Sequence, residues 1–190
     1  DSACYYIRNA ALSARNNNNK GRYYFLTAQL YENLKQPDSA LWAFEQVVGL
    51  KRKTNRKYWI NAQIKRLQIL SIRDTIDPIE SYNKLAKGYE NYLFDHSINR
   101  AIGIHYFLQQ QDSLGEHYLQ QSLKSENISA DEALITAILQ KSEFASMPYA
   151  RLLVECLGSL NCDSPDIFKH INELPNDLVG MVTKKLNDLE

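Results

Sequence analysis

Histidines are the side chains through which this chain could most readily bind a metal or move a proton. The sequence has four of them, His96, His105, His117 and His170. If the helices expected from the pattern below form, His105 and His117 lie on adjacent antiparallel helices with Glu116 nearby. A metal site needs three or four ligands that converge at fixed spacing, and neither Glu-x-x-His nor His-Glu-x-x-His occurs. We therefore interpret the histidines as surface residues and expect no metal and no cofactor.

Other patterns typical of enzymes are also missing from the sequence. The seven glycines stand apart, and the closest pair, Gly103 and Gly115, is too widely spaced to shape a phosphate-binding turn. No Gly-x-Ser-x-Gly nucleophile motif occurs. The adjacent carboxylates of Asp131 and Glu132 fall in the first turn of an expected helix, where the helix dipole stabilises negative charge. The prediction is that the chain is not an enzyme.

The cysteines leave two interpretations open. Cys4, Cys156 and Cys162 are odd in number and lack the spacing of metal ligands. Cys156 and Cys162 flank an expected turn at Gly158, so they could form a disulfide in an oxidising compartment. Buried free thiols are the alternative.

Charge and hydropathy argue against two classes of partner. Lysine and arginine together number 22, as do aspartate and glutamate, so no global field draws the chain to nucleic acid or to an anionic membrane. No apolar stretch approaches the roughly 20 residues that a membrane span needs, so we expect no direct membrane insertion. One basic run could grip an acidic partner, or it could be a solvated helix end and turn. It consists of Lys51, Arg52, Lys53, Arg56 and Lys57.

Helical periodicity with internal repetition is the strongest signal in the chain. Residues 23–34 and 38–50 each have the apolar spacing of an amphipathic helix, and Pro37 separates them. The triplet that begins at Asp1 recurs at Asp38, 37 residues later, and a related triplet begins at Asp112, a further 74 residues on. Midway between these, near residue 75, Asp77 and the following proline supply another helix start. The spacing predicts a helical hairpin every 34 to 39 residues, which is the period of tetratricopeptide arrays.

The chain resembles the tetratricopeptide-repeat family at the positions where paired helices need small and aromatic side chains. Ala28, Tyr31, Ala40 and Phe44 match that pattern in one hairpin. Tyr58 and Ala62 match in a second, and Gly103, Tyr106, Leu114 and Tyr118 match in a third if its inter-helix turn is one residue shorter. The resemblance implies an all-α fold, a right-handed α-solenoid of antiparallel helix hairpins with C-terminal capping helices.

This resemblance also sets the expected organisation. Residues 1–128 would hold the repeats, and residues 129–190 would hold a degenerate repeat and capping helices of the same domain. Residues 1–17 would be the second helix of a truncated repeat, and the run from Asn16 to Asn19 would be a polar turn between repeats. Trp42 is expected on the side of its helix that faces away from its hairpin partner.

In the family, the first helices of successive hairpins line a concave groove, and this implies a set of partner-binding residues. Arginine, amide and aromatic side chains would line such a groove and suit a peptide or helix with acidic and apolar residues. Those residues are Arg22, Phe25, Gln29, Asn33, Arg56, Trp59, Gln63, Arg66, Arg100, Ile104 and Phe107. The alternative is that Phe25 and Trp59 pack against neighbouring helices as core and that the arginines are solvated surface.

A narrower resemblance covers about a quarter of the chain. The stretch from Arg22 to Glu32, then Gln36 to Ala40 and a basic segment with asparagine, looks like repeats of Bacteroidota gliding and type IX secretion lipoproteins. That family implies a protein-binding scaffold in the periplasm, anchored to the outer membrane in the parent protein; a cytoplasmic location is the alternative. Two other functions remain open, the sensory segment of a membrane-bound regulator and a helical domain that binds a small ligand.

Overall fold

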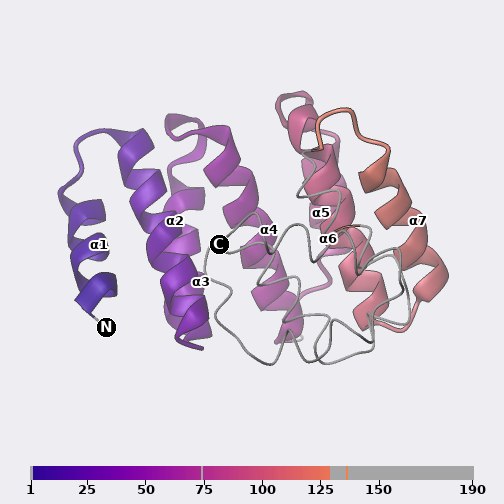
Figure 1. Ribbon diagram of the computed structural model, residues 1–190, viewed down its shortest axis with the longest axis horizontal. Helices are drawn as coiled ribbons and strands as arrows, with labels where there is room; N and C mark the ends of the chain where they lie inside the picture. Colours follow the sequence, from indigo (N-terminus) through magenta and orange to yellow (C-terminus); the bar gives the residue numbers. More distant parts are fainter. Residues whose placement is uncertain (1, 74, 129–135, 137–190) are drawn as a thin grey trace, which may run out of the picture. The chain divides into compact units, whose positions relative to one another are not determined.

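A computed structural model describes residues 2–73, 75–128 and 136 of the 190-residue chain. These residues form seven α-helices and two short 3-10 helices, with no strand among them (Figure 1), so the all-α prediction is confirmed for this part of the chain. The elements are α1 (Ser2–Ser13), α2 (Asn17–Asn33), α3 (Pro37–Gly49), η1 (Lys51–Lys53), α4 (Arg56–Ile72), α5 (Ile79–Ala86), η2 (Tyr89–Phe94), α6 (Asp95–Leu108) and α7 (Asp112–Leu123). The predicted capping helices and the possible disulfide between Cys156 and Cys162 lie outside the described residues.

The chain divides into two compact units between Phe94 and Asp95. In the first unit each helix packs chiefly against the next one along the chain: α1 against α2, α2 against α3, and α3 against α4. Helix α2 also contacts α4 directly. The second unit contains α6 and α7, which pack closely against each other. The first four helices therefore lie side by side in chain order (Figure 1).

The polar run before α2 corrects one expectation. Asn16 is the N-cap, and its side-chain oxygen accepts hydrogen bonds from the backbone N–H groups of Asn18 and Asn19 at 2.8 and 3.4 Å. Asn17, Asn18 and Asn19 are therefore the first turn of α2, not an inter-repeat turn. An asparagine cap satisfies amides that a helix start leaves unpaired, so a polar sequence can begin a helix as well as separate two.

The connection from α2 to α3 is a tight reversal with a residue in the left-handed conformation. Lys35 has φ 55°. Its N–H donates to the Glu32 carbonyl and the Gln36 N–H donates to the Tyr31 carbonyl, each at 2.9 Å, which is the Schellman pattern of a helix C-terminus. Pro37 then opens α3, where its missing amide costs nothing.

The connection from α6 to α7 repeats this geometry 75 residues later. Gln110 has φ 59°, and its N–H donates to the Phe107 carbonyl at 3.0 Å. The Gln111 N–H donates to the Tyr106 carbonyl at 2.9 Å. Because Lys35 and Gln110 hold the same place in the same pattern, the two turns have the same length.

The register predicted for the third hairpin is therefore wrong by one residue. Gly115 takes the place of Ala40, and both are buried, whereas Leu114 is 44% exposed. Leu119 takes the place of Phe44, and both are fully buried. The α6–α7 turn is not one residue shorter, and the small residue that lets the two helices approach is Gly115.

Both left-handed residues carry a Cβ, which leads to a first prediction. A side chain in this conformation costs about 1–2 kcal/mol, whereas glycine gives back about 0.5–1 kcal/mol through its freer unfolded chain. Lys35→Gly should therefore raise the free energy of unfolding, measured in urea, by about 0.5–1 kcal/mol. Lys35→Ala keeps the Cβ and serves as the control. An equal gain from the alanine variant would show that the lysine side chain, not the backbone conformation, causes the effect.

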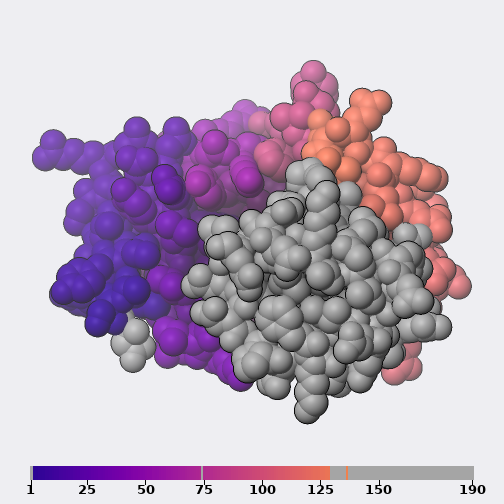
Figure 2. All heavy atoms as spheres, viewed as in Figure 1, coloured from indigo at the N-terminus to yellow at the C-terminus, as the bar shows by residue number. Residues whose placement is uncertain are grey.

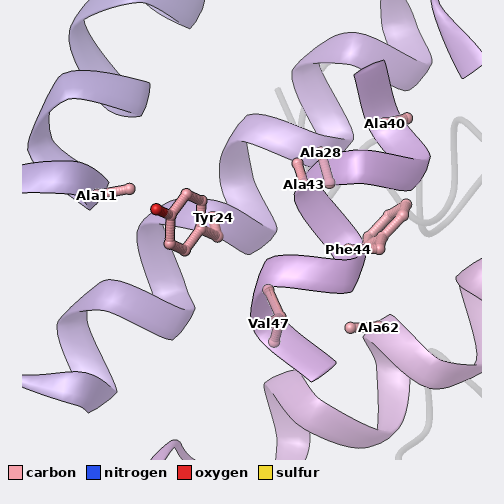
Figure 3. Close-up of a cluster of buried hydrophobic side chains, with 8 residues drawn as sticks. All are labelled: Ala11, Tyr24, Ala28, Ala40, Ala43, Phe44, Val47 and Ala62. Carbon is pink, nitrogen blue, oxygen red and sulfur yellow. The ribbon is translucent and has the colours of Figure 1, made fainter. Parts of the chain in front are cut away.

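The core of the first unit joins α1, α2, α3 and α4 through small residues and two rings, those of Tyr24 and Phe44. Figure 3 shows Ala28 and Ala43 next to each other where α2 meets α3. Phe44 is fully buried in the same cluster. The full cluster is Ala11, Tyr24, Ala28, Ala40, Ala43, Phe44, Val47 and Ala62. Five alanines let the helix backbones approach closely. On the face seen in Figure 2, the atoms of α1 and α2 form one continuous surface.

Trp42 corrects a further expectation about α3. Its ring meets the ring of Tyr24 edge-on, at 5.9 Å between centroids, and the guanidinium of Arg8 lies 4.7 Å from its centroid. Trp42 therefore packs back toward α2 and α1, not away from its hairpin partner.

Helix α5 begins as predicted, after Asp77 and Pro78. The Asp77 carboxylate accepts a hydrogen bond from the Ile79 N–H at 3.0 Å. Tyr82 anchors α5 because its ring is fully buried and its hydroxyl donates to the Ile64 carbonyl of α4 at 3.4 Å. This burial raises the pKa of the Tyr82 hydroxyl, so the group stays neutral.

Candidate functional site

The predicted groove residues of α2 fall into two groups. Arg22, Gln29 and Asn33 are exposed. Phe25 is half-buried, and its ring lies 5.7 Å from the ring of Phe44 and 5.6 Å from that of Tyr58, between centroids. Phe25 therefore contributes packing between α2, α3 and α4, as its alternative interpretation proposed, and the three polar residues face solvent.

On α4, Arg56 and Trp59 form one stacked unit. The Arg56 guanidinium lies 4.0 Å from the centroid of the Trp59 ring, within the range of a cation–π contact. The indole N–H of Trp59 donates to the Val48 carbonyl at 3.1 Å, which fixes the ring against the end of α3. The polar groups of this pair thus bind partners within the first unit.

Asn91 of η2 holds the Arg56 side chain in place. Its side-chain oxygen accepts two hydrogen bonds from the Arg56 guanidinium, at 2.8 Å from Nε and 2.6 Å from Nη2. Its Nδ2 donates to the Leu85 carbonyl at 2.7 Å, near the end of α5. Asn91 is buried, so one amide joins α4, α5 and η2. The pKa of Arg56 is lowered mainly by burial. The negative charge of Glu90 raises this pKa, and the positive charge of Arg52 lowers it further.

The remaining predicted residues of α4 lie beside ion pairs that link it to the preceding helices. Gln63 is half-buried, and so is Arg66, which pairs with Glu45 of α3. The pairs are Lys65–Glu32 at 3.3 Å, Arg66–Glu45 at 3.4 Å and Arg73–Asp38 at 2.6 Å. Both side chains of each pair are partly exposed to solvent. Each pair therefore contributes at most about 1 kcal/mol to stability.

The predicted residues of α6 belong to the second unit. Arg100, Ile104 and Phe107 are half-buried. Phe107 packs on α7, because a Cβ added to Gly115 would lie 2.8 Å from its ring. Helices α2 and α4 contact each other in the first unit. The groove itself, including its extension to α6, stays a prediction.

An open hollow lies where α3, η1 and α4 meet η2. It is lined by Gly49, Leu50, Lys51, Arg52, Lys53, Arg56, Trp59 and Glu90. The Glu90 carboxylate accepts a hydrogen bond from Arg52 at 3.0 Å and lies 3.8 Å from Arg56 Nη2. Glu90 and Asn91 were not among the predicted site residues; they lie 34 and 35 positions beyond Arg56 in sequence, and no local pattern links them to it.

The pKa of the Glu90 carboxyl responds to these cations. The hydrogen bond from Arg52 lowers this pKa, and the charge of Arg56 lowers it further. A carboxyl whose folded pKa lies below its unfolded value favours folding near neutral pH. That contribution is lost as the pH falls through the folded pKa.

His105 and His117 of the second unit pack against tyrosines. His96 is buried in α6, which corrects the expectation of a surface residue, and His170 lies outside the described residues. The rings of His105 and Tyr106 lie 6.0 Å apart and those of His117 and Tyr118 5.4 Å apart, while the two tyrosines stack on each other at 5.6 Å. Within residues 2–73 and 75–128, no three side chains of His, Cys, Asp or Glu lie close enough to hold a metal ion. None of the helices in this part of the chain has both the length and the apolar composition needed to cross a membrane.

Comparison of the chain with protein-family models, with curated proteins and with solved structures finds no match.

Proposed function

We propose that the chain is a tetratricopeptide-like protein-binding scaffold in which the exposed polar face of α2 and the neighbouring surface of α4 receive a peptide or helix of a partner protein. The observation that carries the proposal is the recurrence of one hairpin geometry. The α2–α3 and α6–α7 turns share a left-handed residue and the same two hydrogen bonds at a 75-residue offset. This offset is close to twice the period of a helical-hairpin array.

An array of this kind functions through the surface that its helices present. On one exposed side of α2, Arg22 lies about two turns before Gln29, and Gln29 lies about one turn before Asn33. An arginine fork and two amides can bind carboxylates and backbone groups of a partner. Helices α2 and α4 contact each other within the first unit, which supports a binding surface that draws on both. By the resemblance to envelope lipoproteins, we place the scaffold in a bacterial envelope assembly and assign it no catalytic role.

The test is site-specific photo-crosslinking with a benzophenone amino acid at Gln29 in extracts of the source organism, followed by mass spectrometry. Gln29 is exposed, so the substitution leaves the core unchanged. The same photoreactive residue at Gln36, exposed in the α2–α3 turn, is the positional control. We expect one partner to be captured at Gln29 and not at Gln36.

A second variant makes the result specific for the polar face of α2. Arg22→Glu with Gln29→Glu should abolish co-purification of that partner, while Arg15→Glu with Gln36→Glu changes the net charge equally and should not. Equal capture by both double variants, with unchanged helicity, would overturn α2 as the binding face. No specific capture in any arm would overturn the scaffold function.

A further inference from the structure

Four exposed basic residues lie at or next to the hollow beside α4, and three of them, Lys51, Arg52 and Lys53, line it. Lys51, Arg52 and Lys53 form the 3-10 helix η1, and Lys57 follows in the first turn of α4; we call these four the basic turn. All four are exposed. Within the described part of the chain, Arg52 is the member of this group that has an ion pair, with Glu90.

The helix that follows the basic turn increases its positive potential. A helix N-terminus carries about half a positive charge, so an acidic residue is the stabilising choice in the first turn. Helix α3 has Asp38 there and α7 has Asp112. Helix α4 has no acidic residue in its first turn and instead has Arg56 and Lys57. This arrangement works against helix stability and concentrates unneutralised charge at one place on the surface.

The hollow already holds one carboxylate. Glu90 places its oxygen 3.0 Å from Arg52 and 3.8 Å from Arg56, so the geometry of this surface accommodates an acidic side chain. One internal carboxylate balances only part of the positive charge contributed by the basic turn and Arg56. The surplus is available to a second acidic group from outside.

Apolar side chains line the hollow or lie next to a lining residue in sequence. The Trp59 ring and the Leu50 side chain line it. Tyr89, the neighbour of Glu90 in η2, is 90% exposed, and its ring contacts that of Tyr92 at 6.0 Å between centroids. Rigid aromatic side chains beside cations suit a ligand that combines carboxylates with a large apolar residue.

We propose that the basic turn binds an acidic peptide segment of a partner protein, with glutamates or aspartates on both sides of one aromatic or aliphatic residue. The carboxylates would pair with Lys51, Lys53 and Lys57, and the apolar residue would pack near Trp59 and Tyr89. This inference goes beyond the proposed scaffold function, because it names the partner chemistry of a second surface that is distinct from the polar face of α2.

The experiment measures fluorescence anisotropy of a short fluorescein-labelled peptide in which glutamates flank one phenylalanine on both sides. We expect Lys53→Glu with Lys57→Glu to weaken binding about tenfold or more. Lys84→Glu with Lys124→Glu changes the net charge equally at exposed positions elsewhere and should change binding less than about twofold. Binding should also weaken as the salt concentration rises from about 50 to about 300 mM. A peptide with lysine in place of glutamate should not bind.

The same variants also serve as a control for correct folding. An acidic residue at position 57 improves the electrostatics of the α4 N-terminus, so lost binding in that variant does not come from a destabilised helix. Circular dichroism and urea unfolding of both double variants check this directly.

Three outcomes would overturn the inference. Equal losses in the two double variants would show that net charge, not the basic turn, governs binding. If the peptide does not bind, but phosphatidylglycerol vesicles or single-stranded DNA bind in a way that depends on Lys53 and Lys57, the basic turn recognises a different class of ligand. Capture of a partner at Gln29 without any peptide binding would leave the scaffold function standing and this inference wrong.

Discussion

Leu119→Ala is expected to lower the free energy of unfolding by about 2–5 kcal/mol, the range found for leucines deleted from well-packed cores. Leu119 is fully buried, and its side chain lies directly over Gly103: a Cβ added to that glycine would be 2.8 Å from Leu119 Cδ2. The close approach of α6 and α7 at Gly103 leaves little freedom for the helices to collapse into the space that a smaller side chain vacates.

Leu114→Ala is the matched comparison, because it deletes the same atoms from the same helix. Leu114 is 44% exposed, so its loss should cost less than about 0.5 kcal/mol. Urea unfolding followed by circular dichroism measures both variants. A Leu114→Ala variant that loses as much stability as Leu119→Ala would support the shorter α6–α7 turn expected from the sequence and contradict the register described above.

The register of the third hairpin was mispredicted because acidic residues at helix starts do not set how two helices contact each other. The recurring triplet at Asp38 and Asp112 is spaced by 74 residues, but the hairpins repeat with an offset of 75. Acidic residues in a first turn improve helix electrostatics at several adjacent positions, so they do not fix a register. Small residues do, because helix backbones approach only where a side chain is short. Ala28 and Ala40 are 12 positions apart, and Gly103 and Gly115 are separated by the same interval.

Local signals explain what the sequence predicted correctly. Pro37 fixes the start of α3 because proline lacks the amide that a helix interior requires. Asp77 marks the start of α5 because its carboxylate accepts a hydrogen bond from the Ile79 N–H. The apolar positions around Phe44 identify the buried side of α3 through their helical spacing. Such features act within one or two turns and are therefore visible in sequence.

The site was less predictable, since its geometry depends on contacts between distant residues. Helical spacing correctly placed Phe25 and Trp59 in the second and fourth helices, but it did not decide between a groove and a packing role. That distinction comes from the Phe44 and Tyr58 rings around Phe25 and from the Val48 carbonyl that binds Trp59. The conformation of Arg56 depends on Asn91, in a segment with no repeat pattern.

Asn91 is the position where one substitution should disturb both the fold and the hollow. We expect Asn91→Ala to lower the free energy of unfolding by about 2–4 kcal/mol. The substitution removes the acceptor of two hydrogen bonds from a charged group and the donor that satisfies the Leu85 carbonyl. Asn33→Ala, at an exposed asparagine of α2, should change stability by less than about 0.5 kcal/mol.

A double-mutant cycle isolates the contact between Asn91 and Arg56. If the guanidinium is held by this amide, Arg56→Ala and Asn91→Ala should be non-additive, with a coupling of about 1–2 kcal/mol. Gly88→Ala perturbs the Asn91 side chain independently, because the added Cβ would lie 2.7 Å from Asn91 Nδ2. Gly88→Ala should therefore cost more stability in the wild-type background than in the Asn91→Ala background, where that side chain is absent. Additive effects in the cycle would show that the hydrogen bonds from Arg56 to Asn91 do not stabilise the fold. The orientation of Arg56 toward the hollow would then depend on its stacking on Trp59 and on its ion pair with Glu90. In that case Glu90→Gln would be the substitution that changes the orientation of Arg56.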